Sequence, residues 1–248
     1  MVAASPENFD DMTVAGNEFL RRLEGMTYGE DPRAGFFQGS LFVHPDLAFV
    51  FRFPEGWATQ NAADAVTGIS PNRDAIIQFR GSRGTPVEAA ERFLAQEGIQ
   101  SGPRSTGRIH GNPAISAEFA AQSQDGGSVR GTVTFVEYDG ATWGILAYST
   151  ADRFSAYSPA FVRSMNSFER LTDPAALAVQ PMRVRIVAVP RAMSLQQFHA
   201  ETPSGISLAE LAMINGLEES AQLRSGQLMK RVTGTPIVVA GRPGHDPL

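Results

Sequence analysis

The sequence has 248 residues and 42% hydrophobic content, enough to bury one large core or two ordinary ones. Its formal net charge of −5 is spread along the chain, and no run of Lys and Arg suits nucleic acid or an anionic membrane. No apolar stretch approaches the roughly twenty residues of a membrane span, and residues 2–13 are polar and acidic, unlike an export signal. We therefore expect two domains, with no nucleic-acid partner, no membrane span and no signal peptide.

Residues 1–40 are predicted to form a short docking helix and an irregular lead-in. Within residues 17–26, apolar side chains at helical spacing share one face, and Gly25 stands where a helix typically ends. Residues 28–39 contain several glycines and an Asp-Pro pair, a composition typical of turns. We therefore expect no regular structure between the helix and residue 40.

Residues 41–173 carry the apolar patterns of a first domain. Alternating or β-rich apolar residues predict six strands, at 47–53, 65–69, 75–79, 114–120, 129–138 and 142–148. The last two strands are joined by Asp139-Gly140, the dipeptide most typical of a two-residue hairpin turn. We therefore expect an antiparallel hairpin at the centre of the domain.

Two helices interrupt these strands. A Thr-Pro-Val-Glu sequence beginning at Thr85 supplies a cap, a first-position proline and a capping box, and Gly98 is predicted to follow the helix end. Ser158-Pro159 opens the second helix, whose apolar residues recur at helical spacing as far as Phe168. Because the strands come in runs with helices inserted between them, we expect an α+β fold, an antiparallel sheet with helices on one face.

A second, smaller module follows a linker. Residues 174–181 have the composition of a linker, and residues 234–248 that of a flexible tail. Between them, residues 182–233 predict a βααβ module with a strand at 184–189, helices at 194–200 and 207–214, and a strand at 227–232.

Two resemblances cover the first part of the chain. The sequence at residues 19–33, with His-Pro-Asp-Leu-Ala-Phe at 44–49 and Phe-Pro-Glu-Gly-Trp at 53–57, resembles the region that follows the catalytic domain in certain bacterial zinc proteases. These proteases are gluzincins, of the family that includes the CAAX prenyl proteases. The order of strands and helices from 47 to 171 is similar to that of PsbP-like domains.

The end module resembles LysM, a carbohydrate-binding βααβ domain. The similarity lies in Ser194-Leu195, Leu211, Asn215-Gly216-Leu217 and Gly226-Gln227-Leu228, which match the LysM order. In that family the sugar groove lies between the loop before the first helix and the loop after the second. The resemblance therefore implies a glycan groove at Ser194, Leu195, Asn215 and Gly216.

The module departs from the LysM pattern at both ends. Ala192-Met193 stands where Gly-Asp is usual, and Lys230-Arg231-Val232 replaces the common Ile-Pro ending. Met193 in place of Asp removes one hydrogen-bond acceptor from the loop before the first helix, and a sugar site depends on such groups. We therefore expect weak peptidoglycan binding at best.

No catalytic motif is present. A gluzincin needs His-Glu-x-x-His, which places two imidazoles one helical turn apart on zinc. Here the spacing is absent, and the four histidines lie far apart, at His44, His110, His199 and His245. With no cysteine in the chain, thiolate metal sites and disulfides are also excluded. We expect no enzyme activity, no metal site and no cofactor.

Two further groups have competing interpretations. Trp57 and Trp143 are candidates to line a ligand pocket, although core packing is the more common role of a Trp in such positions. Glu30 and Asp31 are candidates to bind calcium, although hard cations require six or more oxygens and exposed acidic pairs are more often solvated.

The leading interpretation is a non-catalytic binding or scaffolding region of the bacterial periplasm or cell envelope. Its expected partners are another protein or an upstream protease domain and, weakly, peptidoglycan. The alternative is a fragment of a zinc metalloprotease whose His-Glu-x-x-His domain lies upstream of this chain. A third interpretation is an exported PsbP-like protein that binds no sugar.

Overall fold

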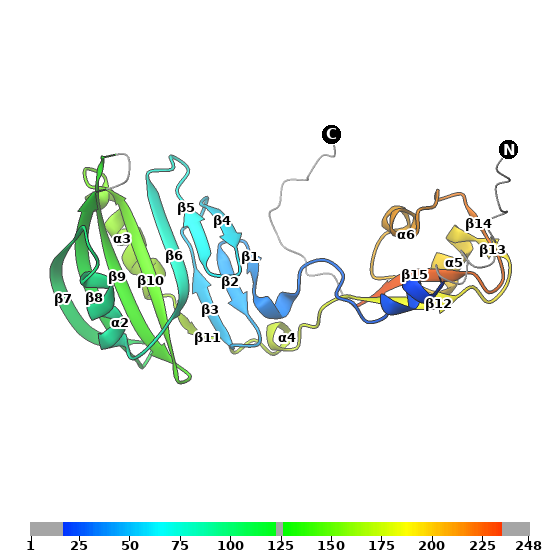
Figure 1. Ribbon diagram of the computed structural model, residues 1–248, viewed down its shortest axis with the longest axis horizontal. Coiled ribbons are helices and arrows are strands. Elements are labelled where there is room, and N and C mark those ends of the chain that lie inside the picture. The colour runs from blue at the N-terminus through cyan, green and yellow to red at the C-terminus, as the bar shows by residue number, and fades with distance from the viewer. Residues whose placement is uncertain (1–16, 123–125, 235–248) are drawn as a thin grey trace, which may run out of the picture. The chain divides into compact units, whose positions relative to one another are not determined.

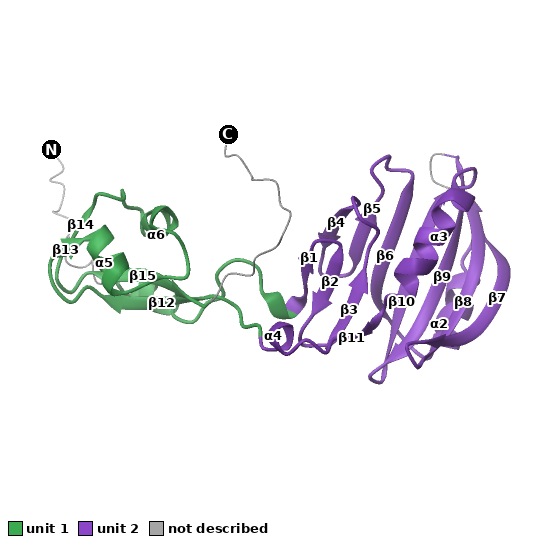
Figure 2. Cartoon of the chain, turned by 180° about the vertical axis from the view of Figure 1, so that it is seen from behind, with its two compact units in different colours: residues 1–33, 179–238 green, residues 34–178, 239–248 purple. Residues whose placement is uncertain are grey.

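The computed structural model describes residues 17–122 and 126–234 (Figure 1). Within them, the chain forms two compact units (Figure 2). The larger unit is Ala34–Ala178, and the smaller unit combines the described residues up to Arg33 with those from Val179 onward. In the described residues, no helix combines the length and apolar character needed to cross a bilayer.

The larger unit contains a seven-stranded antiparallel sheet in the order β4-β5-β6-β10-β9-β8-β7. Its strands are β4 Ala58–Asn61, β5 Val66–Ile69, β6 Ala75–Ser82, β7 Ile99–Ile109, β8 Asn112–Gln122, β9 Ser128–Tyr138 and β10 Ala141–Thr150. A second antiparallel sheet has the order β1-β2-β3-β11, with β1 Phe36–Gln38, β2 Leu41–His44, β3 Phe49–Arg52 and β11 Glu169–Arg170. The predicted α+β class with an antiparallel sheet is confirmed.

Two helices of the larger unit cover opposite faces of the seven-stranded sheet, not one face as predicted. They are α2, Pro86–Leu94, and α3, Phe154–Met165. Adjacent residues of β9 show the division, because Phe135 joins the core cluster under α2 and Val136 joins the cluster under α3. Since successive side chains of a strand alternate between faces, each helix seals one side, as the two opposite views show (Figures 1 and 2).

The four-stranded sheet packs on the α3 face through aromatic rings. Phe51 stacks on Phe79 with ring centroids 5.1 Å apart, and Phe49 lies 5.2 Å from the same ring. All three side chains are fully buried. The aromatic residues of β3 therefore join the two sheets into one core.

The predicted helix starts are confirmed for α2 and wrong for α3. Thr85 caps α2 with the expected capping box, although the helix ends at the C-cap Ala95, before Gly98. Helix α3 begins at Phe154, so Pro159 lies inside it instead of at its first turn. Proline lacks the amide hydrogen that a helix interior needs, which is why its position misled the sequence prediction.

The hairpin turn is confirmed, whereas several strands were missed. Asp139 and Gly140 both have positive φ, 50° and 76°, as a two-residue hairpin turn requires. Strands β1, β2, β4 and β7 were not predicted; β1 lies in the expected irregular lead-in, directly after the short helix η1, Pro32–Ala34. Strand β7 contains Gly102-Pro103 at a break in its register with β8, and this bulge disguised an 11-residue strand.

The smaller unit has the predicted strand–helix–helix–strand order with one added strand pair. Its elements are β12 Arg183–Ala188, β13 Met193–Ser194, α5 Leu195–Glu201, α6 Leu208–Asn215, β14 Gln222–Leu223 and β15 Leu228–Thr233. Strand β12 pairs with β15, and β13 with β14, both antiparallel. The predicted linker 174–181 begins with a helical turn, α4 Pro174–Leu177, that belongs to the larger unit. The predicted tail lies outside the described residues from 235 onward.

The N-terminal segment belongs to the smaller unit and is not a lead-in to the larger one. Residues 17–22 are helical, and the chain then runs beside β12. The amide of Gly25 donates to the carbonyl of Val184 (2.8 Å), and the amide of Val184 donates to the carbonyl of Met26 (2.8 Å). Because Phe19 is 62% exposed, the helix does not bury the predicted apolar face as a whole.

Candidate functional site

The predicted glycan groove begins at the first turn of α5, where its residues have structural roles. The hydroxyl of Ser194 accepts a hydrogen bond from the amide of Gln197 (3.1 Å), and the Gln197 side chain accepts in return from the Ser194 amide (3.0 Å). The neighbouring Leu195 is fully buried in the core of the unit. Leu195 therefore offers no side-chain surface to a sugar, and Ser194 serves as a helix cap.

The other half of the predicted groove is also committed to the fold. The Asn215 amide nitrogen donates to the carbonyls of Leu211 (2.8 Å) and Lys230 (2.9 Å), and its oxygen accepts from the Lys230 amide (2.8 Å). The left-handed residue at the end of α6 is Gly216, with φ 65°. Asn215 thus fastens the end of α6 to β15.

The histidines are not gathered into a metal centre. His44 lies at the end of β2, His110 in the β7–β8 turn and His199 in α5, whereas His245 lies outside the described residues. Across residues 17–122 and 126–234, no group of three or more His, Asp or Glu side chains is placed to hold a metal ion.

Asp31, the calcium candidate, is engaged by a cation of the chain itself. Its two carboxylate oxygens accept hydrogen bonds from the Arg33 guanidinium, the shortest 2.6 Å long. These bonds lower the pKa of the Asp31 carboxyl below its usual value. A calcium ion at Asp31 would therefore have to compete with Arg33.

A groove on the larger unit offers freer polar groups. Helix α3 packs on β9 and β10, leaving the same face of β7 and β8 partly uncovered. The resulting hollow has a volume of about 390 Å³, and we call it the α3 groove. Both polar and apolar side chains line it. They include Ser105, Ser116, Glu118, Thr132 and Thr134 from the strands and Ser158, Val162 and Met165 from α3.

Hydroxyl groups form the floor of the α3 groove. Thr134 donates to the sulfur of Met165 (3.3 Å), so the Ser116 hydroxyl, 2.8 Å away, donates to Thr134 and keeps its own lone pairs for another donor. The hydroxyls of Ser105, Thr132 and Ser158 have no hydrogen-bond partner among the residues that the structure describes. The floor can therefore both donate to and accept from a ligand.

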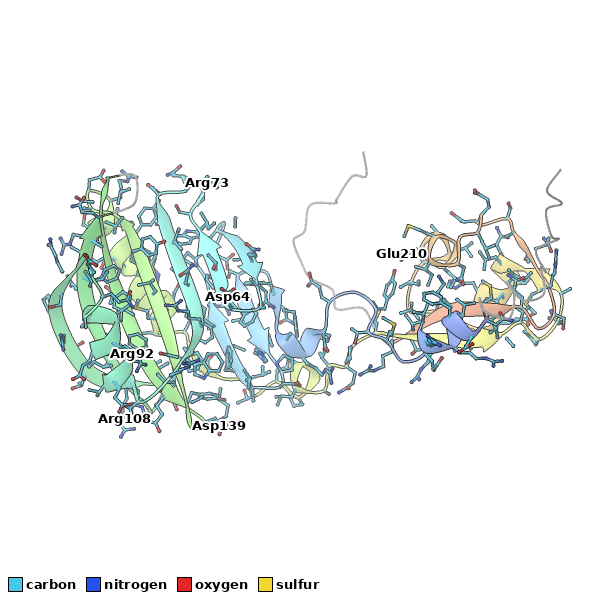
Figure 3. The ribbon with its side chains drawn as sticks, viewed as in Figure 1. Asp64, Arg73, Arg92, Arg108, Asp139 and Glu210 are labelled. Carbon is cyan, nitrogen blue, oxygen red and sulfur yellow. The ribbon has the colours of Figure 1, made fainter. Side chains whose placement is uncertain are left out.

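Polar contacts of His110, Arg108 and Arg130 lie at the two ends of the α3 groove. At one end, His110 Nε2 lies 2.8 Å from the carbonyl of Asn166, which ties the β7–β8 turn to the end of α3. Arg108, labelled in Figure 3, precedes this turn, and its guanidinium donates to the carbonyl of Gly111 (2.6 Å). At the other end, Arg130 forms an ion pair with Glu118 (3.3 Å). These contacts keep the groove open beside α3.

The two tryptophans both lie in the larger unit. Trp57 packs edge-on against Tyr157 and Phe161, as expected for a core residue. Trp143 stacks on Phe79 with ring centroids 5.2 Å apart and also lines a second hollow. The two interpretations of Trp143, packing and pocket lining, therefore apply together.

Sequence reasoning missed the α3 groove because one of its strands, β7, was not predicted. A signal was nevertheless present in β8 and β9. Ser116 and Glu118 alternate with buried apolar residues, and so do Thr132 and Thr134 one strand away. Polar side chains at every second position of paired strands can face a hollow in the protein as well as open solvent. The pattern in β8 and β9 therefore indicates either a hollow or an exposed face.

No family model matches the chain, and no curated protein matches it. Among solved structures, it is similar to the cyanobacterial PsbP protein CyanoP of Synechocystis, at 17% identity, with a TM-score of 0.42 and coverage of 53% of this chain and 93% of that one. LpqN of Mycobacterium tuberculosis, described as involved in cell envelope biogenesis, is 14% identical, with a TM-score of 0.37 and coverage of 50% and 83%. A protein of Bacteroides thetaiotaomicron is 10% identical, with a TM-score of 0.42 and coverage of 80% and 87%. The expected similarity to PsbP-like domains is thus found, the association with a zinc protease gains no support, and similarity at this level assigns no ligand or activity.

Proposed function

We propose that this chain is a non-catalytic binding module whose larger unit takes a small polar ligand in the α3 groove. The observation that carries the proposal is the set of three unpartnered hydroxyls, on Ser105, Thr132 and Ser158, in one hollow. Its volume of about 390 Å³ lies in the usual range of ligand sites. Binding would satisfy these groups together.

The chemistry of the groove favours a ligand with several hydroxyl or amide groups, and Arg104 and Arg108 in its lining can pair with a carboxylate of such a ligand. Hydroxyls both donate and accept, and the carboxylate of Glu118 is already paired with Arg130. Val162, 49% exposed on α3, offers an apolar wall for the carbon skeleton of such a ligand. Peptidoglycan fragments combine these features, and the LysM-like sequence pattern supports an envelope setting.

The smaller unit is assigned a scaffolding role by the same proposal. The polar atoms of its predicted groove are used within the unit, by the α5 cap and by Asn215. Three large apolar side chains remain exposed on it, Phe19 at 62%, Met26 at 52% and Met213 at 69%. Exposed apolar groups of this size suit contact with a protein partner more than contact with a sugar.

The test is a titration of the isotope-labelled chain with a soluble peptidoglycan fragment, the N-acetylglucosamine–N-acetylmuramic acid disaccharide with its peptide, followed by NMR. We expect shifts at Ser116, Thr132 and Val162. Val162→Trp should fill the groove and weaken binding by about ten-fold or more. The matched control is Val87→Trp, because Val87 is 50% exposed on α2, on the opposite face of the sheet.

Two results would contradict the proposal. Shifts confined to Ser194 and Asn215 would move recognition to the smaller unit and restore the predicted LysM-like groove. Equal loss of binding in Val162→Trp and Val87→Trp would show that the substitutions act through stability and not through the groove.

A further inference from the structure

A second hollow of the larger unit is lined partly by aromatic rings. It has a volume of about 310 Å³ and lies where strands β2 and β3 meet the β6–β10 part of the large sheet. Five of its fifteen lining residues carry a ring, Phe42, His44, Phe49, Phe79 and Trp143, and the others are mostly small or polar. We call it the Trp143 pocket. It shares no lining residue with the α3 groove.

The position of Trp143 leaves room beside its ring. Trp143 on β10 pairs directly with Gly81 on β6, so no side chain stands opposite the indole. A Cβ atom on Gly81 would lie 3.9 Å from the indole ring, an ordinary contact distance. The other side of the indole is supported by Phe79, which stacks almost parallel to it, at an interplanar angle of 6°. The pocket therefore has a rigid flat wall.

The mouth of the pocket is made of small or exposed residues. The β4–β5 connection contributes Ala62, Ala63 and Asp64, the last labelled in Figure 3. Leu47, 42% exposed, lines the pocket from the turn after β2. A small molecule can reach the aromatic walls past side chains of this size.

One ring N–H group in the lining lacks an acceptor. The indole nitrogen of Trp143 is buried without a hydrogen-bond partner among the described residues. Nearby, the His44 ring accepts the Leu47 amide at Nδ1 (3.3 Å). Burial lowers the pKa of His44, which favours the neutral imidazole. Unpaired buried donors are uncommon, and the indole N–H calls for an acceptor.

We infer that the Trp143 pocket binds a small flat ring compound that carries a hydrogen-bond acceptor such as a carbonyl. The ring stacks among Phe49, Trp143 and His44, and its acceptor takes the N–H of Trp143. Aromatic packing by itself accounts for the stack on Phe79, but it gives the indole N–H no acceptor. A ligand with both a ring and an acceptor satisfies both observations.

The experiment uses the full chain labelled with nitrogen-15 and two matched probes, benzamide and toluene. Trp57→Phe leaves Trp143 as the single indole, because the chain has two tryptophans. Benzamide should move the Trp143 indole N–H resonance downfield, as a new hydrogen bond does. Its affinity should exceed that of toluene by about five-fold, the factor that one net neutral hydrogen bond gives.

Gly81→Leu should place a side chain over the indole and abolish benzamide binding. Thr67→Leu is the control, since Thr67 pairs with Gln78 on the opposite face of the same sheet. Equal affinity for the two probes, no shift of the indole N–H, or binding that survives Gly81→Leu would each overturn the inference. Val162→Trp should leave benzamide binding intact, so failure of the α3 groove and failure of the Trp143 pocket are distinguishable.

Discussion

The two units of this chain are stabilised in different ways. The larger unit has an aromatic core in which Phe49, Phe51, Phe79, Phe161 and Phe168 are almost fully buried. The core of the smaller unit is mainly aliphatic residues and methionine, with one buried phenylalanine. Helices α5 and α6 of the smaller unit begin with complete capping boxes, as α2 does in the larger unit. Aromatic rings fill one core, whereas aliphatic side chains and methionine fill most of the other.

The two units also differ in where polar groups remain for a ligand. The smaller unit uses the side chains of its predicted groove to cap α5 and to fasten α6, and among its described residues the buried Nδ1 of His199 has no partner. In the larger unit, three hydroxyls of the α3 groove and the buried indole nitrogen of Trp143 have no partner among the described residues. The two hollows that contain unpartnered groups therefore both lie in the larger unit.

The largest predicted effect tests the aromatic core. Phe161→Ala should destabilise the larger unit by about 3–5 kcal/mol, because it removes a fully buried ring that contacts Trp57 and Tyr157. Urea unfolding followed by tryptophan fluorescence measures it, since both tryptophans lie in this unit. Phe19→Ala, at a 62% exposed ring, is the control with little expected change. Equal destabilisation of the smaller unit by Phe161→Ala would mean that the two units unfold together.

A smaller effect tests the fastening role of Asn215. Asn215→Ala should destabilise the smaller unit by about 1–3 kcal/mol, because the Lys230 amide and two carbonyls lose their partner. Asn215→Asp retains an acceptor for the Lys230 amide but sets a carboxylate oxygen against the carbonyls of Leu211 and Lys230, so it should cost at least as much. Hydrogen exchange of amides in α6 and β15 measures both variants. Unchanged exchange in Asn215→Ala would make this side chain available for sugar binding after all.

The smallest effect tests how the N-terminal segment is attached. Glu24 accepts from the Ile186 amide (2.6 Å) and the Arg185 guanidinium (2.9 Å), and these bonds lower the pKa of its carboxyl. Since the folded pKa lies below the unfolded one, this contribution is present above about pH 4.5 and is lost as the pH falls through the folded pKa. Because the side chain is 44% exposed, Glu24→Gln should cost less than about 1 kcal/mol at pH 7. The difference from wild type should vanish near pH 3 in pH-dependent thermal unfolding; a constant difference would assign the effect to packing.

Local signals in the sequence were sufficient for elements that depend on adjacent residues. The Asp139-Gly140 turn, the capping box at Thr85 and the order of strands and helices in residues 182–233 all follow from short-range chemistry. Such features require no knowledge of distant partners. This is why they could be predicted while the arrangement of the sheet faces could not.

The remaining features depend on pairing between distant residues. The segment near Gly25 pairs with β12, although the whole sequence of the larger unit lies between them in the chain. Nothing in the glycine-rich composition of the segment indicates this partner. The hydroxyls at Ser116 and Thr132 become a groove floor only because β7 and α3 flank them. The role of Asn215 likewise depends on Lys230, which only the folded structure brings close.

The smaller unit is assembled from two separated parts of the chain, and this has a consequence for synthesis. The segment near Gly25 leaves the ribosome about 150 residues before its partner strand, a delay on the order of 10–30 s at usual elongation rates. The larger unit has time to fold in that interval, while the early segment still lacks its partner. On polysomes, the segment of one nascent chain can meet the β12 strand of another. A dimer formed by this exchange would contain only native contacts.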